Sequence, residues 1–176
     1  MSDGLDVIFS RHPGLREAKA VMLCGISGSG KTHFARSLEK AGFTRLSLDR
    51  LIGETYGKEF QSLSGEEQWR LTAEAERRIA EKGCEASCKG EKVVIDGCLC
   101  KRAKRDSMRE ALRLAGVEPR LVYLKADFGT SLRRLEAREG KGYDDIRITG
   151  AMLQRFFRGF QPPDDDEQAI VIDTSE

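Results

Sequence analysis

Residues 25–32 constrain the fold more than any other stretch, because they read Gly-Ile-Ser-Gly-Ser-Gly-Lys-Thr. The spacing fits G-x-x-x-x-G-K-[ST], in which the glycines let successive backbone N–H groups turn inward and cradle phosphate oxygens. Lys31 can reach the β- and γ-phosphates of a nucleotide, and the Thr32 hydroxyl can ligate Mg²⁺. The alternative is a glycine-rich turn with an accidental Lys-Thr pair, and the flanking sequence distinguishes the two.

The motif lies between a strand and a helix, as this phosphate-binding loop (the P-loop) requires. Residues 21–24 are apolar and predict a buried strand that enters the loop, and residues 31–40 predict a helix that leaves it. We therefore expect the chain to bind a nucleoside triphosphate, ATP, with Mg²⁺, and Lys31 to act in catalysis. His33 is expected beside the nucleotide in a passive role. The residues predicted to hold the nucleotide are Gly25, Ser27, Gly28, Ser29, Gly30, Lys31, Thr32 and His33.

The composition indicates one domain without a bias towards a polyanionic partner. The chain has 176 residues, with 30 Lys and Arg against 29 Asp and Glu, which gives a net charge of +1. No apolar run approaches the roughly 18 residues of a membrane span, and no cleavable signal pattern precedes the first strand. We expect a cytoplasmic protein with no membrane partner and with reduced thiols at its five cysteines. A zinc site at C-x3-C and C-x-C is the alternative for these cysteines.

Strands and helices alternate along the rest of the chain, which is typical of a parallel sheet covered on both faces. Further strands are predicted at residues 43–48, 93–95, 121–124 and 169–172, and further helices at about 64–84, 101–115, from 129, and 151–160. Residues 50–63 carry few clear signals. We expect a three-layer α/β fold, the P-loop NTPase fold of nucleotide-kinase type, with a five-stranded parallel sheet in the order 2-3-1-4-5.

Residues 1–18 are predicted to be an N-terminal extension, and residues 19–176 a single domain with a lid at about 138–147. Leu5, Ile8 and Phe9 could share one face of a short helix in this extension, which His12-Pro13-Gly14 would end. We expect that apolar face to pack on the domain.

Several segments beyond the P-loop resemble those of the small P-loop kinases. They are residues 46–49, 93–97, 123–128, 134–138 and 160–163, the last followed by Asp166-Glu167. Together they cover nearly the whole chain from about residue 20. The chain is similar to the gluconokinase-like enzymes, to the kinase domain of polynucleotide kinases, and to the zeta-toxin and antibiotic-phosphotransferase group. The resemblance implies an ATP-dependent kinase.

The sequence departs from both named kinase types where they recognise the acceptor. Polynucleotide kinases of this type place an Arg three residues after the catalytic Asp, where this chain has Ile52. Gluconokinases carry a His-Pro and Asn/Met segment after their Asp, where residues 50–54 read Arg-Leu-Ile-Gly-Glu. The resemblance therefore implies a kinase and names no acceptor.

Two carboxylates are predicted at the carboxyl ends of strands beside the P-loop, where open α/β sheets bind ligands. Asp49 is expected to accept a hydrogen bond from the substrate hydroxyl and to orient or deprotonate it, and the alternative is a helix N-cap. Asp96 is expected to hold Mg²⁺ with Thr32, directly or through water. A turn residue before Gly97 is the alternative for Asp96.

Arg134 and Arg138 lie four residues apart, and therefore on one face of a predicted helix, immediately before the lid. In the resembled kinases such arginines cover the nucleotide and stabilise charge on the transferred phosphoryl group. Both are therefore predicted to be catalytic, whereas Arg133 is expected to be solvated. An exposed basic helix is the alternative for all three.

A second basic helix bears on nucleic-acid binding. Its arginines, which could follow a phosphate backbone, fall on one face; they are Arg102, Arg105, Arg109 and Arg113. The apolar residues centre on the opposite face, so we expect the arginines to face water, with Arg102 and Arg105 near enough to the sheet edge to meet an anionic substrate. Trp69 and Tyr56 are placed at the cleft, and core packing explains them equally well.

These residues predict a kinase that transfers the γ-phosphate of ATP to a hydroxyl of a small metabolite or nucleotide-like acceptor. It would be a phosphotransferase with an alcohol group as acceptor. One alternative is a 5′-hydroxyl polynucleotide kinase; the balanced net charge and Ile52 count against it, so nucleic acid is a possible partner but not the favoured one. The other is a nucleotide-binding switch or NTPase that has no phosphoryl acceptor.

Overall fold

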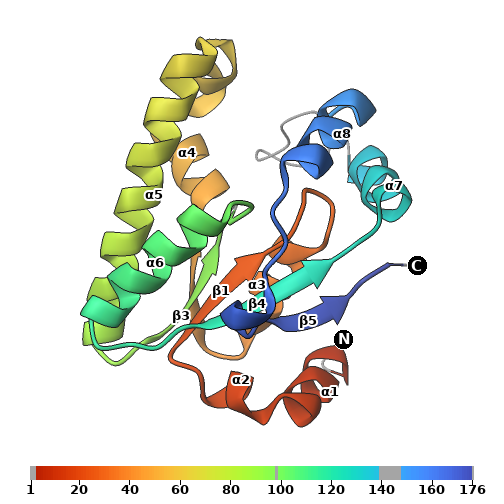
Figure 1. Cartoon of the computed structure of the whole chain (residues 1–176). Coiled ribbons are helices and arrows are strands. Elements are labelled where there is room, and N and C mark those ends of the chain that lie inside the picture. Colours follow the sequence, from red (N-terminus) through yellow and green to blue (C-terminus); the bar gives the residue numbers. More distant parts are fainter. Residues whose placement is uncertain (1–2, 98, 139–147, 176) are drawn as a thin grey trace.

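Five parallel strands form one sheet in the order β2-β3-β1-β4-β5, which confirms the predicted order. The strands are β1 (Ala20–Cys24), β2 (Phe43–Ser47), β3 (Lys92–Asp96), β4 (Arg120–Lys125) and β5 (Ile170–Asp173). At the centre of the sheet, Met22 of β1 pairs with Ile95 of β3 and with Leu121 of β4. The structure is a computed structural model and describes residues 3–97, 99–138 and 148–175 (Figure 1).

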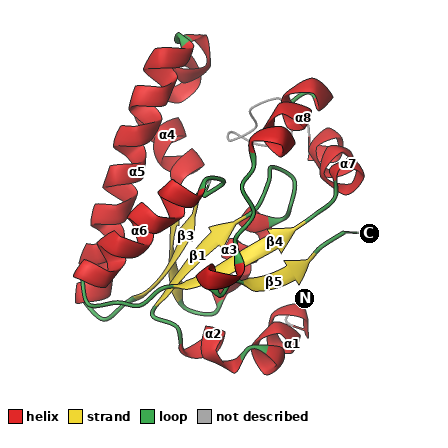
Figure 2. Cartoon of the chain, viewed as in Figure 1, coloured by secondary structure: helices red, strands yellow, loops and turns green. Residues whose placement is uncertain are grey.

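Helices cover both faces of this sheet, so the fold has the three layers expected from the sequence (Figure 2). The helices are α1 (Asp3–Arg11), α2 (Pro13–Glu17), α3 (Lys31–Lys40), α4 (Leu48–Tyr56), α5 (Gly65–Cys88), α6 (Arg102–Leu114), α7 (Phe128–Arg138) and α8 (Gly150–Gly159), with short 3-10 helices η1 (Gly57–Ser62) and η2 (Asp165–Glu167). One apolar cluster joins α4, α5 and α6 to the sheet, and a second joins α1, α2 and α3 to its other face.

The central strand β1 divides its side chains between these two clusters. Ala20, Met22 and Cys24 belong to the cluster beneath α5 and α6, whereas Val21 and Leu23 belong to the cluster beneath α3. All five are fully buried, and this two-sided burial explains why the strand is uniformly apolar. The P-loop therefore starts from the most deeply buried strand of the protein.

The N-terminal helices pack beneath the P-loop helix α3. Phe9 of α1 and Leu15 of α2 are buried in the same cluster as Phe34 and Leu38 of α3. Leu5 and Ile8 are partly buried against that cluster, so the apolar face expected in residues 3–11 does pack on the domain. α1 ends at Arg11, and the Pro13 that was expected to stop the chain begins α2 instead.

Two parts of the chain differ from the sequence-based expectation. Residues 50–63 form most of α4 and all of η1, and α4 begins at the N-cap Ser47 and buries Leu48 and Ile52. Trp69 lies on α5 with 72% of its surface exposed and does not line the pocket described below, so both interpretations of Trp69 are wrong. No described helix is both long and apolar enough to cross a membrane.

Candidate active site

The P-loop connects β1 to α3 in a backbone conformation that only glycine tolerates at two positions. Gly25 has φ +152°, and a Cβ there would lie 2.5 Å from the carbonyl oxygen of Leu124. Gly28 has φ +83°, and a Cβ there would lie 2.6 Å from the carbonyl oxygen of Ser131. These glycines let the loop pack directly on β4 and α7 while its backbone N–H groups face a pocket.

This pocket has a volume of about 600 Å³ and extends from the P-loop to α8. Of the residues predicted to hold the nucleotide, the pocket is lined by Ser27, Gly28, Gly30, Lys31, Thr32 and His33. Gly25 and the fully buried Ser29 lie in the loop but do not line the pocket. The Lys31 ammonium donates a hydrogen bond to the carbonyl oxygen of Ile26 at 2.8 Å, which holds it over the loop. The start of α3 supplies further N–H groups and the positive end of the helix dipole to the same space.

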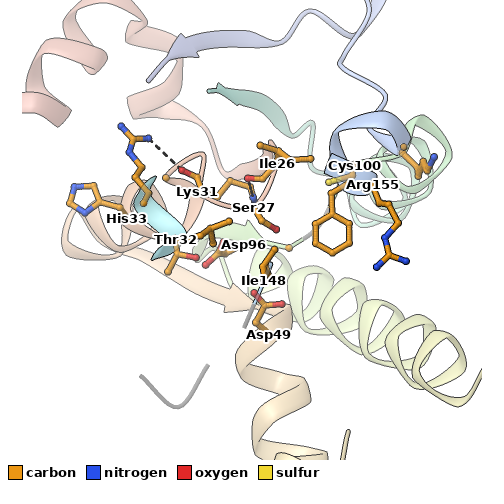
Figure 3. Close-up of a pocket in the computed structure, with 18 of the residues that line it drawn as sticks. Ile26, Ser27, Lys31, Thr32, His33, Asp49, Asp96, Cys100, Ile148 and Arg155 are labelled. Carbon is orange, nitrogen blue, oxygen red and sulfur yellow. Dashed lines mark hydrogen bonds between the residues drawn. The ribbon is translucent and has the colours of Figure 1, made fainter. Parts of the chain in front are cut away.

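Asp49 lines the same pocket from the first turn of α4 (Figure 3). The N-cap of α4 is Ser47, whose hydroxyl accepts a hydrogen bond from the backbone N–H of Arg50. The interpretation of Asp49 as an N-cap is therefore wrong, and its carboxylate lies one turn into the helix, facing the P-loop pocket. The first turn favours a carboxylate through the helix dipole.

Asp96 lines the pocket at the end of β3 and is paired with Arg45, a residue that sequence reasoning missed. Arg45 donates to the Oδ2 atom of Asp96 at 2.9 Å from Nε and 2.7 Å from Nη2, and both side chains are largely buried. The residue in register with Asp96 on β2 is Ser47, so Arg45 is its diagonal neighbour. An arginine on a strand beside an aspartate at a sheet edge was the available signal.

Arg134 lies beside the P-loop and joins it to the end of β5. It donates to the carbonyl oxygen of Thr174 at 2.8 Å and to that of Gly28 at 3.5 Å, and it lines the pocket. Arg133 is exposed, as expected. The side chain of Arg138 and residues 139–147 of the predicted lid lie outside the described residues.

The far end of the pocket contains residues that the sequence analysis did not select. Cys100 and Lys101 follow β3, and Arg155, Phe156 and Gly159 come from α8. Figure 3 shows Cys100 and Arg155 close together, across the pocket from His33 and Thr32. No motif indicated them, because their meeting depends on how α8 returns to the sheet.

Arg105 is buried in the wall behind that end and does not face water or a substrate. It is 0% exposed and donates to both carboxylate oxygens of Glu167 at 2.7 Å. It also donates to the carbonyl oxygens of Leu99 at 3.0 Å and Gln161 at 2.8 Å. The predicted solvated face of α6 is therefore wrong at Arg105, because a guanidinium with five donors finds acceptors on three segments.

The buried pair also changes the proton affinity of its carboxylate. Burial by itself would raise the pKa of Glu167, but the hydrogen bonds from Arg105 outweigh it and hold that pKa below its ordinary value. The other arginines of the predicted stripe are bonded to carboxylates too: Arg102 to Asp166, Arg109 to Asp106 and Arg113 to Glu118. The stripe that could have followed a phosphate backbone is thus occupied by internal ion pairs.

The described cysteines are Cys24, Cys84, Cys88 and Cys100, and all four are free thiols. Burial raises the pKa of the Cys84 thiol. Within residues 3–97, 99–138 and 148–175, no group of three or more His, Cys, Asp or Glu side chains could hold a metal ion. Cys98, one member of the C-x-C pair, lies outside the described residues.

Comparisons with known proteins place this geometry in a family. The profile of a family described as an AAA domain matches residues 21–163. The fold is similar to a gluconokinase from Sinorhizobium meliloti 1021, with 22% identity over 89% of this chain and 83% of that one and a TM-score of 0.61. It is also similar to a sugar kinase from Janibacter sp. HTCC2649, with 22% identity over 89% of this chain and 85% of that one and a TM-score of 0.66. No curated protein sequence matches the chain. Because the profile covers most of its length, the protein belongs to this AAA-domain family, and its fold is that of the small P-loop kinases.

Proposed function

We propose that the protein is an ATP-dependent kinase that transfers the γ-phosphate to a hydroxyl group of a small metabolite or nucleotide-like acceptor. The observation that carries this proposal is that Asp49 of α4 lines the same pocket as Lys31 and Thr32 of the P-loop. A nucleotide-binding site needs the P-loop alone. A carboxylate facing the phosphate-binding residues across the pocket has a further use, because it can hold an acceptor hydroxyl beside the γ-phosphate.

Each residue has a definite task in such a transfer, which depends mainly on positioning and charge. The P-loop N–H groups and the Lys31 ammonium would hold the phosphates and balance charge on the oxygens of the transferred group. Asp49 would accept a hydrogen bond from the acceptor hydroxyl, orient it and take its proton as the bond to phosphorus forms. Arg134, fixed between Gly28 and Thr174, would stabilise charge on the phosphates from the other side.

The residues present fit a Mg²⁺ ion, which the fold family implies. Thr32 and Asp96 bring a hydroxyl and a carboxylate to the pocket, and Mg²⁺ prefers oxygen ligands while keeping several of its waters. Arg45 bonds only to Oδ2 of Asp96. When bound, the ion would neutralise charge on the β- and γ-phosphates. We propose Thr32 and Asp96 as the residues that hold it, with Asp96 acting directly or through water.

The polynucleotide-kinase alternative is less well supported. Its basic stripe on α6 is bonded to carboxylates of the same protein, as described for Arg105 and its neighbours. A guanidinium committed to an internal ion pair must lose that partner before it can bind a backbone phosphate. We therefore propose a small molecule as the acceptor.

The substitution Asp49→Asn separates a kinase from a nucleotide-binding switch. It keeps the shape of the side chain and removes its capacity to take a proton, so we expect acceptor-dependent turnover to fall about 10²- to 10⁴-fold. The dissociation constant for ATP, measured by calorimetry, should stay nearly unchanged. Glu54→Gln is the matched control, because Glu54 lies on the same helix, pairs with Arg50 and does not line the pocket. A change in ATP affinity alone, with no effect on transfer, would contradict the kinase proposal.

A further inference from the structure

The pocket is much more basic than the protein as a whole. The chain carries a net charge of +1, yet the basic side chains that line the pocket are Lys31, Arg36, Lys101, Arg134 and Arg155, against the two carboxylates of Asp49 and Asp96. Asp96 is already paired with Arg45. The pocket thus concentrates positive charge, which attracts anionic ligands.

The P-loop phosphates account for only part of this charge. Lys31 belongs to the loop itself, whereas Lys101 and Arg155 line the opposite end of the pocket (Figure 3). Within residues 3–97, 99–138 and 148–175, no carboxylate forms an ion pair with Lys101 or Arg155. By contrast, Arg102, next to Lys101 in the chain, is bonded to Asp166. The two cations that face the pocket are thus available to a ligand.

Lys101 and Arg155 lie close together although they are far apart in the sequence. A Cβ on Gly159 would lie 3.8 Å from the Lys101 ammonium, so that ammonium lies over the end of α8. Arg155 precedes Gly159 by four residues and therefore lies one turn away on the same helix face, and both line the pocket. Phe156 adds an apolar ring to this end of the pocket.

The backbone that carries both cations is held rigidly from behind. The Gln161 N–H donates to the carbonyl oxygen of Cys100 at 2.9 Å, and the Arg102 N–H donates to Oε1 of Gln161 at 3.0 Å. Arg105, buried with Glu167, holds the carbonyl oxygens of Leu99 and Gln161 together. Such support positions the cations before a ligand arrives, which reduces the entropy lost on binding.

We infer that Lys101 and Arg155 form a subsite for an anionic group of the acceptor, a carboxylate or a phosphate. The acceptor is then a small hydroxyl-bearing acid that reaches from this subsite to Asp49. This inference rests on the proposed function for the role of the ligand, and on the pocket geometry for its charge. Phe156 would contact the carbon skeleton between the two polar ends.

The test compares acceptors that differ only in the anionic group. D-Gluconate is paired with D-glucose for the carboxylate, and adenosine 3′-monophosphate is paired with adenosine for the phosphate. In each productive pair, we expect the acid to have a KM at least tenfold below that of its neutral partner. Lys101→Met and Arg155→Gln should each raise the KM of the acid about tenfold and leave the ATP dissociation constant unchanged. Arg158→Gln, on the same helix but outside the pocket, should change neither.

A binding measurement separates failure of this inference from failure of the kinase proposal. The four compounds are titrated calorimetrically into the protein saturated with Mg²⁺ and a non-hydrolysable ATP analogue. Binding of an acid that Lys101→Met and Arg155→Gln weaken, without turnover, would uphold the subsite and overturn the kinase. Turnover of neutral acceptors as good as that of the acids, unaffected by these variants, would overturn the subsite and leave the kinase. Absence of binding by every acid would overturn the subsite as well.

Discussion

The two ends of the pocket are built in different ways. The P-loop end is one continuous stretch of backbone, and it rests on an apolar cluster in which Phe9 and Leu15 meet α3 and β1. The far end consists of side chains from the segment after β3 and from α8, and the wall behind it is tied by the buried Arg105–Glu167 pair. Phosphate handling thus depends on local sequence and apolar packing, whereas the far end depends on long-range polar contacts.

The buried pair should have the largest effect when it is broken. Arg105→Met leaves Glu167 as an uncompensated buried carboxylate, so we expect a loss of about 3–5 kcal/mol in the free energy of unfolding. Urea denaturation measures this loss. Arg102→Met is the matched control, since Arg102 lies on the same helix and pairs with the neighbouring Asp166 at the surface, where ion pairs contribute little. Equal losses in both variants would show that burial of the pair is not what stabilises this wall.

The apolar support of the P-loop end should come next. Phe9→Ala removes a ring that is only 7% exposed from the cluster beneath α3, which should cost about 3 kcal/mol. Val7→Ala, on the same helix at 48% exposure, should cost far less. Thermal unfolding followed by circular dichroism measures both variants. An unchanged midpoint for Phe9→Ala would mean that α1 contributes nothing to the domain.

The backbone of the P-loop should show its dependence on glycine in nucleotide affinity. Gly28→Ala places a Cβ 2.6 Å from the Ser131 carbonyl oxygen, so the loop must shift, and we expect ATP to bind about ten- to a hundredfold more weakly. Gly30→Ala has a similar positive φ of +91° but no atom within 4 Å of its Cβ, which isolates the strain from the clash. Calorimetric titration with ATP distinguishes them. Equal weakening would assign the effect to backbone strain alone.

The smallest expected effect is a difference in acid sensitivity. The pKa of Glu167 is lowered in the folded protein, so its contribution to stability is present above the ordinary carboxyl pKa of 4.5 and is lost as pH falls through its folded value. Glu167→Gln should therefore be less stable at neutral pH and show a shallower loss of stability below about pH 4.5. Urea midpoints measured from pH 7 to pH 3 test this. Parallel curves would show that the pair does not titrate as stated.

Much of the fold could be predicted because its signals are local. The P-loop is one contiguous motif, and the five strands are short apolar runs whose order follows from the fold that such motifs adopt. The helix α4 was missed although Ser47 caps it and Leu48 and Ile52 recur at helical spacing. Gly53 and Gly57 within and after this segment weaken the pattern, since glycine is a poor helix former.

The far end of the pocket could not be predicted for a physical reason. Arg105 is buried because Glu167, 62 residues later, returns to meet it, and no periodicity in α6 contains that information. Lys101 and Arg155 lie in ordinary polar surroundings in the sequence and share a pocket end only after α8 has folded back. Arg45 differs, because its diagonal position to Asp96 was within reach of a strand-pairing argument.

The most direct test of phosphoryl transfer is to measure ADP formation by the purified protein with Mg²⁺ and ATP, with and without an acceptor. The panel contains sugars, sugar acids, nucleosides and 5′-hydroxyl oligonucleotides. If Asp49 presents an acceptor hydroxyl to the nucleotide, ADP should form in step with a phosphorylated small acid and only slowly without it. ADP formation at the same rate whether or not an acceptor is present would contradict the kinase and favour a nucleotide-binding switch.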